Sequence, residues 1–316
     1  MEDGRWKIEP WDTLPEIPSP TPSAISHLPK NTPMPNFPIV DTHLHIWNLE
    51  RLRYPWLVNV PMLNKNHLIG DYRKACGPVA VAKMVFLQCE ADFALFQEEA
   101  DWVTEVARTD PRIRGLVPWA PLEKGDAAEA ELARLASNPL IKGIRRIIQF
   151  EADPEFCLKP GFVRGVQSLP RHGLSFDLCI NHLQLANTLK LVKQCPNVKF
   201  VMDHIAKPDI KAGLLDPWRA ELRELAKFPN VWCKMSGLVT EADFAKWTPA
   251  DLKPYIDHVL DCFGFDRVIF GGDWPVSTQA TDYPRWVNTL DAAIKGASPD
   301  EQHKLYVRNA EAFYRV

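Results

Sequence analysis

Residues 199–238, KFVMDHIAKPDIKAGLLDPWRAELRELAKFPNVWCKMSGL, contain one complete strand–helix–strand unit. Lys199–Ile205 and Val231–Leu238 are apolar for nearly their whole length, which is typical of parallel strands that are buried on both faces. Between them, Asp216–Lys227 has the amphipathic pattern of a helix. A helix between two buried strands predicts a right-handed βαβ crossover.

The same alternation continues through residues 38–316 and gives eight strand–helix cycles. Eight cycles are the number that a (β/α)8 barrel needs, so we predict an α/β protein with a single TIM barrel. A doubly wound sheet is the alternative, but no GxGxxG motif follows any strand. The other predicted strands are Pro38–Trp47, Ala82–Ala91, Ile113–Pro121, Ile141–Phe150, Leu174–Asn181 and Val268–Pro275, and the other predicted helices are Ala94–Thr109, Asp126–Leu135, Leu183–Gln194, Pro254–Phe263 and Pro284–Lys295, with Pro160–Leu169 filling the remaining crossover.

Residues 1–37 differ from the rest of the chain because they contain eight prolines. This density disfavours helices and central strands and favours an extended, polyproline-like chain. We therefore predict two segments, a Pro-rich extended arm over residues 1–37 and one barrel domain over residues 38–316. Trp6, Ile8 and Trp11 could anchor the arm on the barrel or on a second subunit, so the arm is compatible with a homodimer.

The overall composition excludes several classes of protein. The 37 Lys and Arg residues and 40 Asp and Glu residues give a net charge of −3, whereas nucleic-acid binders and membrane-surface proteins need a basic face. No run approaches the roughly 18 apolar residues that span a bilayer, and the N-terminus lacks the apolar core of a signal peptide. The seven cysteines are scattered and form no CxxC pair, which favours reduced thiols. We predict a soluble, cytoplasmic protein that binds neither nucleic acid nor membranes.

Polar residues at the carboxyl ends of the predicted strands are the candidates for function, because barrel sites lie at that end. The first strand contains Val40-Asp41-Thr42-His43-Leu44-His45 near its end. Residues i and i+2 of a strand share a face, so His43 and His45 both point into the mouth of the barrel. Two imidazoles on one face suit zinc or manganese, or a cationic pair for an anion.

Two further strands bring polar residues to the same end. The sixth strand continues into Asp203-His204, and the eighth runs into Gly271-Gly272-Asp273. The two glycines allow the backbone to approach a ligand closely. A carboxylate at Asp273 beside imidazoles is a suitable general base for activating a water molecule.

This arrangement resembles the amidohydrolase superfamily, in particular the amidohydrolase 2 group that holds L-fuconolactonases, L-rhamnonolactonases and related sugar-lactone hydrolases. The resemblance implies the barrel fold and the hydrolysis of a small lactone by a carboxylic ester hydrolase. It rests on six motifs in the expected order: Val40–Trp47 (VDTHLHIW), Tyr54–Leu57 (YPWL), Lys142–Arg145 (KGIR), Asp203–Pro208 (DHIAKP), Lys234–Leu238 (KMSGL) and Phe270–Val276 (FGGDWPV).

The family pattern implies a role for each matching position of the site. Asp273, His204 and Arg145 match the catalytic positions: Asp273 would activate water, and Arg145, His204 or a divalent ion would hold the developing oxyanion. His43, His45 and Asp273 match the positions that bind one divalent metal ion, zinc or manganese. Lactonases of this group exist with and without a required metal, so both versions of the site are compatible with the sequence.

Departures from the superfamily pattern limit the expected metal chemistry. Enzymes with two metals use a carboxylated lysine on the fourth strand, whereas Lys142 lies at the wrong end of this strand, so we do not expect a binuclear centre. His182, after the fifth strand, is compatible with a metal ligand, a substrate contact or a structural role. Lys234 either caps a carboxylate or reaches the mouth. Ser236 has no evident His–Asp partner in the sequence, which disfavours a serine-hydrolase triad.

Aromatic and amide side chains follow several strands and could hold a ring-shaped substrate. Core packing is the alternative for the tryptophans. The predicted substrate-binding residues are Tyr54, Trp56, Gln88, Trp119, His182 and Trp274.

Three functions are compatible with these residues. The first is hydrolysis of a sugar-acid lactone or a similar cyclic ester, and the second is metal-dependent, non-oxidative decarboxylation, which other members of the superfamily perform. The third is a barrel that binds a ligand without turnover. The YPWL and FGGDWPV motifs favour the lactonase, and a small-molecule lactone is then the expected partner.

Overall fold

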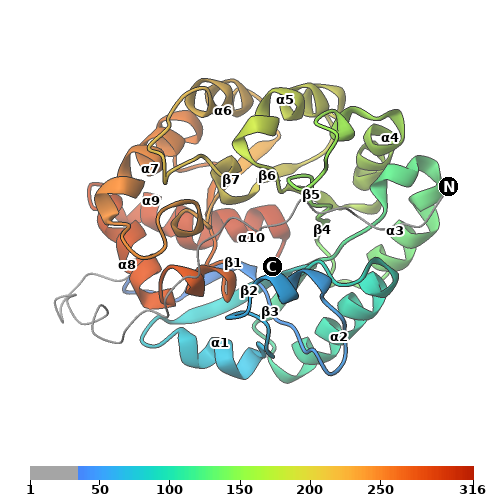
Figure 1. The fold of residues 1–316 in the computed structure, drawn as a ribbon, viewed down its shortest axis with the longest axis horizontal. Helices are drawn as coiled ribbons and strands as arrows, with labels where there is room; N and C mark the ends of the chain where they lie inside the picture. Colours follow the sequence, from blue (N-terminus) through green and yellow to red (C-terminus); the bar gives the residue numbers. More distant parts are fainter. Residues whose placement is uncertain (1–34) are drawn as a thin grey trace.

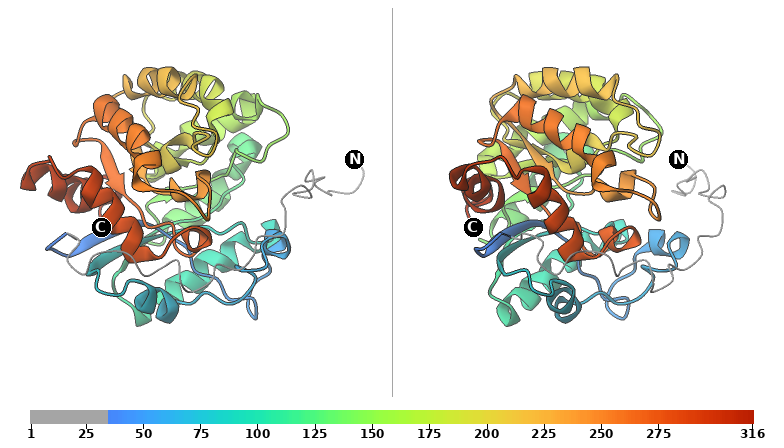
Figure 2. Two further views of the ribbon diagram at one scale, coloured as in Figure 1. Left: turned by 60° about the vertical axis from the view of Figure 1, so that its left-hand side comes forward. Right: turned by 90° about the vertical axis from the view of Figure 1, so that its left-hand side faces the viewer.

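The computed structural model describes residues 35–316, and the predictions for the first 34 residues lie outside this range. Eight parallel strands lie in the middle of the molecule, and the helices surround them (Figures 1 and 2). The strands are β1 (Ile39–Leu44), β2 (Val81–Leu87), β3 (Ile113–Val117), β4 (Gly143–Ile144), β5 (Ser175–Leu178), β6 (Phe200–Met202), β7 (Val231–Met235) and β8 (Val268–Phe270).

Helices follow the strands in the predicted alternation, and all seven predicted crossover helices are present. Most of their bounds agree with the prediction to within three residues. The helices are α1 (Ile69–Ala75), α2 (Phe96–Thr109), α3 (Glu129–Ala136), α4 (Pro160–Ser168), α5 (Leu185–Gln194), α6 (Trp218–Ala226), α7 (Pro249–Phe263), α8 (Tyr283–Ala293), α9 (Pro299–His303) and α10 (Asn309–Tyr314).

Helix α7 begins five residues earlier than predicted, at Pro249 instead of Pro254. The backbone N–H of Thr248 donates to the Asp251 carboxylate at 2.7 Å, and the Thr248 hydroxyl donates to the same oxygen at 2.9 Å. This cap supplies partners at the start of the helix, where backbone donors lack them. The helix continues through Pro254 in its interior.

The strands form two parallel sheets, whereas the sequence predicted one closed sheet. β1, β2 and β3 form the first sheet, and β4 to β8 form the second. Single parallel bridges connect the two sheets, between Leu44 and Trp274 on one side and between Leu116 and Ile141 on the other. β4 is reduced to two residues because the chain after Ile144 leaves the ladder, although the N–H of Arg145 still donates to the Pro118 carbonyl at 2.9 Å.

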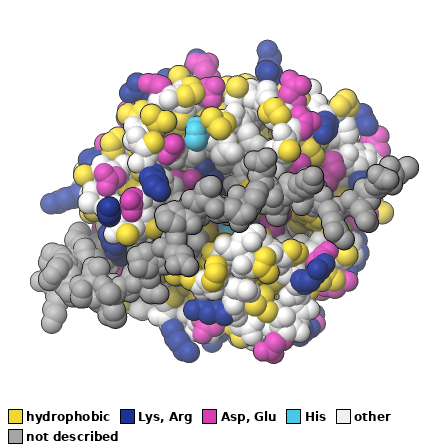
Figure 3. All heavy atoms as spheres, viewed as in Figure 1, with side chains coloured by type: hydrophobic (Ala, Val, Ile, Leu, Met, Phe, Trp, Pro, Cys, Tyr) yellow, Lys and Arg dark blue, Asp and Glu magenta, His cyan; other side chains and the backbone are white. Residues whose placement is uncertain are grey.

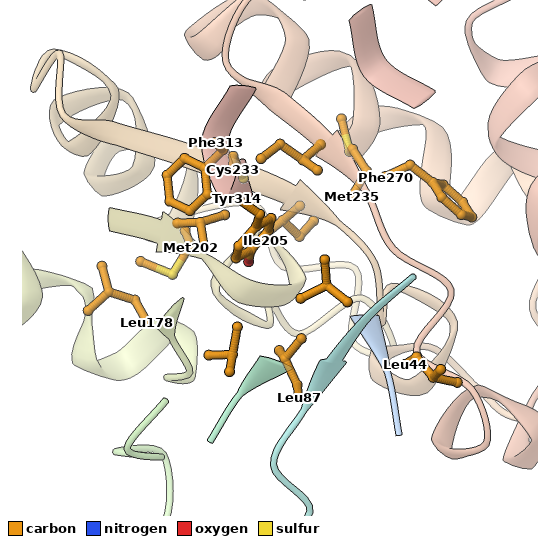
Figure 4. Packing of buried hydrophobic residues seen from close by; sticks show 14 of the residues in the cluster. Leu44, Leu87, Leu178, Met202, Ile205, Cys233, Met235, Phe270, Phe313 and Tyr314 are labelled. Atoms are coloured by element: carbon orange, nitrogen blue, oxygen red, sulfur yellow. The ribbon is translucent and has the colours of Figure 1, made fainter. Parts of the chain in front are cut away.

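An apolar core fills the space around and between the strands. Figure 4 shows buried side chains from several strands converging, among them Met202 and Cys233 close to Tyr314 from α10. Trp47, Trp218 and Trp286 are also fully buried. Charges of both signs are interspersed over the face seen in Figure 3, as expected from the balanced composition. No helix within residues 35–316 is long and apolar enough to cross a membrane.

Candidate active site

The carboxylate of Asp41 joins the ends of β1 and β8. Its Oδ2 accepts from the hydroxyls of Tyr72 and Tyr283 at 2.7 and 2.9 Å. Its Oδ1 accepts from the backbone N–H groups of His43 and Gly272 at 2.9 and 2.8 Å. Four hydrogen bonds satisfy this fully buried carboxylate, so the two strand ends are held in a fixed relation.

Backbone bonds between the same strand ends bring His43, His45 and Asp273 together. The Asp273 N–H donates to the His43 carbonyl at 2.8 Å, and the His45 N–H donates to the Trp274 carbonyl at 2.8 Å. Glycine is required at position 271, because a Cβ there would lie 2.7 Å from the Cβ of His43. The close neighbour of this glycine is the His43 side chain. Its predicted role in the approach of a ligand stays a prediction.

Three imidazoles and one carboxylate form the centre of the site, with at most 5 % of any of these residues exposed. Asp273 Oδ1 lies 3.7 Å from His43 Nε2 and 3.6 Å from His45 Nε2. The ring of His204, from the turn after β6, lies 4.3 Å from the ring of His43. The structure thus brings together the four residues that the sequence placed at the ends of three different strands.

Hydrogen bonds orient two of the imidazoles. His45 Nδ1 lies 2.8 Å from the Leu87 carbonyl, which fixes the proton on Nδ1 and leaves the Nε2 lone pair toward Asp273. His204 Nδ1 lies 2.9 Å from the hydroxyl of Ser236. The sequence showed no evident His–Asp partner for Ser236, whereas the structure gives Ser236 a histidine partner. The partner comes from a neighbouring strand, and linear spacing cannot reveal such a pair. The prediction against a serine-hydrolase triad stays a prediction.

The three imidazoles are held in their neutral form. Burial lowers the pKa of His43, and the nearby cations Lys234 and Arg145 lower it further. Burial likewise lowers the pKa values of His45 and His204, although Asp273 opposes the shift at His45. A neutral imidazole can ligate a metal ion or accept a proton, and an imidazolium can do neither.

Arg145 lies against the imidazole cluster, as the family resemblance implied, and is 3 % exposed. Its Nη1 is 3.2 Å from His43 Nε2 and 3.4 Å from Asp203 Oδ2, and its Nη2 donates to the Gln88 carbonyl at 2.5 Å. The guanidinium therefore places a fixed positive charge beside the imidazoles. Nη1 and Nη2 thus have partners within the protein, whereas the buried Nε–H has none among the described residues.

Sequence reasoning missed a buried ionic network beneath this cluster. Lys234 Nζ lies 2.9 Å from Asp177 Oδ2 and 2.8 Å from Asp203 Oδ1, and all three side chains are fully buried. The Tyr314 hydroxyl donates to Asp177 at 2.6 Å. Lys234 therefore caps two carboxylates, which is one of the two roles that the sequence left open. The available signal was a charged residue inside an otherwise apolar strand, at positions 177 and 234.

Among residues 35–316, two groups of side chains have ligand atoms close enough to share a metal ion; within each group these atoms lie within 4.8 Å of one another. The first consists of His43, His204 and Asp273, with His45 Nε2 also facing Asp273. It fits a divalent cation, because its imidazoles are neutral and the hydrogen bond of His45 to a carbonyl is typical of metal-binding histidines. Arg145 must release His43 Nε2 for that atom to bind the ion.

The second group, Cys179, Asp203 and His204, fits a cation poorly. Lys234 and Arg145 already engage the two oxygens of Asp203. Burial raises the pKa of the Cys179 thiol to about 11, whereas a metal ligand must be a thiolate.

Three of the predicted substrate-binding residues are held in the wall beside β1 and β2. The Trp274 ring packs against His67 and Tyr72, with centroid distances of 5.4 and 5.5 Å. Trp56 Nε1 donates to the Cys89 carbonyl at 2.8 Å. Tyr54 is 4 % exposed and lies beside the buried Glu99 carboxyl, which raises the pKa of the Tyr54 hydroxyl further after the larger effect of burial.

We expect the buried Glu99 carboxyl to make the free energy of unfolding depend on pH. Burial raises the pKa of Glu99 to about 8, so the folded protein binds a proton there that the unfolded chain releases near pH 4.5. Stability is then lost as the pH rises through this interval. Glu99→Gln keeps an acceptor for the Cys89 N–H, which lies 3.1 Å from Glu99 Oε1. The variant should gain about 2–4 kcal/mol relative to wild type between pH 5 and pH 8.5, as measured by urea unfolding at both values. An equal difference at the two pH values would contradict a protonated Glu99.

The other three predicted substrate-binding residues lie toward the ends of β2, β3 and β5. Gln88 is fully buried, and its amide donates to Glu90 at 2.7 Å. The Trp119 ring packs 4.9 Å from Phe96 and lines a cavity of about 340 Å³. His182 Nδ1 lies 2.9 Å from the Lys207 carbonyl, and His182 belongs to neither group of close metal-binding atoms.

Comparison with known proteins places the chain among amidohydrolases. The sequence profile of that family matches residues 40–316. An L-fucono-1,5-lactonase from Burkholderia ambifaria is 34% identical over 286 residues, which cover 88% of this chain and 95% of the relative. An L-rhamnono-gamma-lactonase from Scheffersomyces stipitis is 25% identical, over 90% of this chain and all of the relative.

Solved structures of amidohydrolases have a fold similar to that of this chain. An amidohydrolase from Burkholderia multivorans with bound zinc superposes with a TM-score of 0.79 and 30% identity, covering 89% of this chain and 100% of that one. A 2,6-dihydroxybenzoate decarboxylase from Rhizobium superposes with a TM-score of 0.61 over 88% of this chain and 98% of its own. Its identity is 14%, so it shares the fold alone.

Proposed function

Because the chain belongs to the amidohydrolase family, we propose that it hydrolyses a sugar-acid lactone or a similar small cyclic ester. The observation that carries the proposal is the Asp273 carboxylate within 3.7 Å of two buried, neutral imidazoles. The lactonase relatives support the choice of substrate class.

The chemistry follows from the positions of these side chains. Asp273 accepts a proton from a water molecule as the water oxygen bonds to the lactone carbonyl carbon. The ring C–O bond then breaks, and Asp273 returns the proton to the leaving alkoxide, which gives a hydroxy acid. When Ser236 donates to His204 Nδ1, the Nε2–H of His204 is free to donate to the oxyanion. Arg145 supplies positive charge beside it.

A divalent ion such as zinc fits the same site. His43, His45 and Asp273 would hold it, with His204 also in the close group. When bound, the ion would polarise the carbonyl and lower the pKa of a bound water molecule. With the ion bound, Asp273 would still accept and return the proton, and His204 would donate to the oxyanion only where its Nε2 is not a ligand.

The proposal extends to the remaining predictions for this chain. Residues 38–316 would form one catalytic (β/α)8 barrel, a view supported by the bridges that connect the two sheets on both sides. A cytoplasmic location is supported by the seven free cysteines. Substrate contacts by Gln88, Trp119 and His182 are part of the proposal. Those of Tyr54, Trp56 and Trp274 stay predictions, as does the homodimer.

The decisive experiment is acid release by the purified protein from a panel of aldonolactones, at fixed pH, with and without a chelator. We expect hydrolysis of at least one sugar lactone. Activity that survives the chelator would assign the reaction to Asp273, His204 and Arg145 alone. Activity that the chelator removes and zinc or manganese restores would assign an ion to the histidines. If no lactone is opened and an aromatic acid instead releases carbon dioxide, the decarboxylase alternative replaces the lactonase.

A further inference from the structure

The turn after β6 has an unusual backbone. His204, Ile205, Ala206 and Lys207 have φ values of 51°, 51°, 64° and 47°, so four consecutive residues without a glycine lie in the left-handed region. Each such residue costs roughly 1–2 kcal/mol relative to the right-handed form. Strain of this kind persists where the surrounding structure imposes it, and it concentrates at functional sites. His204, at one end of the turn, already belongs to the site. Lys207, at the other end, is therefore a candidate for a functional role.

Contacts from neighbouring loops hold Lys207 in place. Its N–H donates to the His204 carbonyl at 2.8 Å, and its own carbonyl lies 2.9 Å from His182 Nδ1. The loop after β7 contacts the segment that follows this turn, because the Lys211 N–H donates to the Glu241 carbonyl at 2.9 Å. Glu241 also provides the acidic partner of the Lys207 ammonium, and His182 acquires a role in positioning this turn.

The ammonium group of Lys207 is loosely paired although its side chain is only 20 % exposed. Nζ lies 3.7 Å from Glu241 Oε1, beyond hydrogen-bond distance, whereas a lysine ammonium offers three donors. Its charge also reaches the catalytic cluster, because it contributes to the lowered pKa values of His43 and His204. Burial opposes the charge of Lys207, but Glu241 and, to a smaller extent, Asp273 raise the pKa of Lys207. A largely buried cation without full pairing is energetically costly unless a ligand completes its coordination.

Arg145 and Lys207 differ in how many of their donors are already used. Arg145 is held by Gln88, Asp203 and His43. Lys207 has only the distant Glu241 carboxylate as a side-chain ion-pair partner among residues 35–316. The Nε–H of Arg145 is unpaired within the described part of the chain but buried, so an anionic group that enters the site near Asp273 finds its accessible free donors on Lys207.

We propose that Lys207 binds the anionic oxygen of the substrate, first the oxyanion that forms on the carbonyl and then the carboxylate of the ring-opened acid. The inference rests on the proposed lactone hydrolysis and adds the residue that recognises the product. Glu241 positions the ammonium, and the left-handed turn holds it on the same side of the site as His204. The ligand class is a hydroxy-carboxylate.

Binding of L-fuconate, the open-chain acid of L-fuconolactone, tests this inference by calorimetry. Lys207→Met removes the charge and keeps much of the length, and Lys207→Arg restores a cation. We expect Lys207→Met to weaken binding about 10- to 100-fold, which is the range for a hydrogen bond to a charged group, and Lys207→Arg to recover part of it. Lys211→Met, on an exposed side chain of the same loop, is the matched control and should bind like wild type.

A second readout separates this inference from the proposed function. With a lactone substrate, Lys207→Met should lower kcat/KM and should also relieve inhibition by the product acid, which a purely structural role would not do. L-Fuconate binding that is unchanged in a folded Lys207→Met protein overturns the inference even if lactones are hydrolysed. Conversely, binding that depends on Lys207 in a protein that opens no lactone supports the anion site and overturns the lactonase proposal alone.

Discussion

Replacing Asp273 with Asn should lower kcat for lactone hydrolysis by about 10²- to 10⁴-fold, which is the usual contribution of a general base. The amide cannot accept the proton of the attacking water, whereas its size and shape match the carboxyl group. Asn also tolerates the positive φ of 56° at this position better than most residues. The backbone bonds at this position, from its N–H to the His43 carbonyl and from the Ser277 N–H to its own carbonyl, are unaffected. Ligand affinity should therefore be largely retained.

The measurement is steady-state hydrolysis together with calorimetric binding of the product acid, each with a chelator and with excess zinc. Both conditions are needed because Asp273 is also a predicted metal ligand. Asp257→Asn, on an exposed face of α7, is the matched control and should leave turnover unchanged. Turnover by Asp273→Asn at the wild-type rate would remove Asp273 from the mechanism. Loss of both turnover and binding would show that Asp273 maintains the structure of the site.

The periodicity of the sequence predicted the order of strands and helices, because burial on both faces gives a continuous apolar run. It could not predict where the strands end. Lys199–Ile205 reads as one apolar strand, yet only Phe200–Met202 pairs with its neighbours, because the left-handed turn begins at His204. Hydrophobicity does not encode the sign of φ, and no glycine marks this turn. The division into two sheets could not be predicted either. The hydrophobic pattern gives no sign that only a single bridge connects β3 to β4.

The candidate site could be predicted where the position of a residue along its strand determines the direction of its side chain. His43 and His45 share a face, and Asp273 follows two glycines, so their convergence could be inferred from position in the fold. Asp177, Asp203 and Lys234 could not be connected in this way, because their contacts cross between β5, β6 and β7. The pairing of Ser236 with His204 has the same origin. Side-chain partners between strands depend on register, which the sequence does not state.

Replacing Lys234 with Met should destabilise the protein more than any surface substitution. The ammonium is fully buried and lies within 2.9 Å of two carboxylates, so its removal leaves both without their shared cation. Breaking a buried ion pair from one side costs about 3–5 kcal/mol, because an uncompensated charge remains inside the protein. We expect a loss of this size in the free energy of unfolding at pH 7.5, as measured by urea denaturation.

The pH dependence of the Lys234→Met variant distinguishes an electrostatic effect from a packing effect. Burial already raises the pKa of Asp177 to about 6, and loss of Lys234 should raise it further. A folded-state pKa above the unfolded value of about 3.9 means that stability increases as the pH falls through that interval. The destabilisation should therefore shrink between pH 7.5 and pH 5.5, whereas a packing defect would not change.

Two further variants complete the test of the buried network. Lys234→Met combined with Asp177→Asn removes one of the unpaired carboxylates and should recover part of the lost stability at pH 7.5. Lys227→Met breaks an exposed pair with Glu224 and should change stability by less than about 1 kcal/mol. If the double variant is as unstable as the single one at every pH, the main role of Lys234 is packing against Tyr314, whose ring lies 5.5 Å from Nζ. If stability recovers, the network is an electrostatic support that holds Asp203, and through it Arg145, beneath the imidazoles.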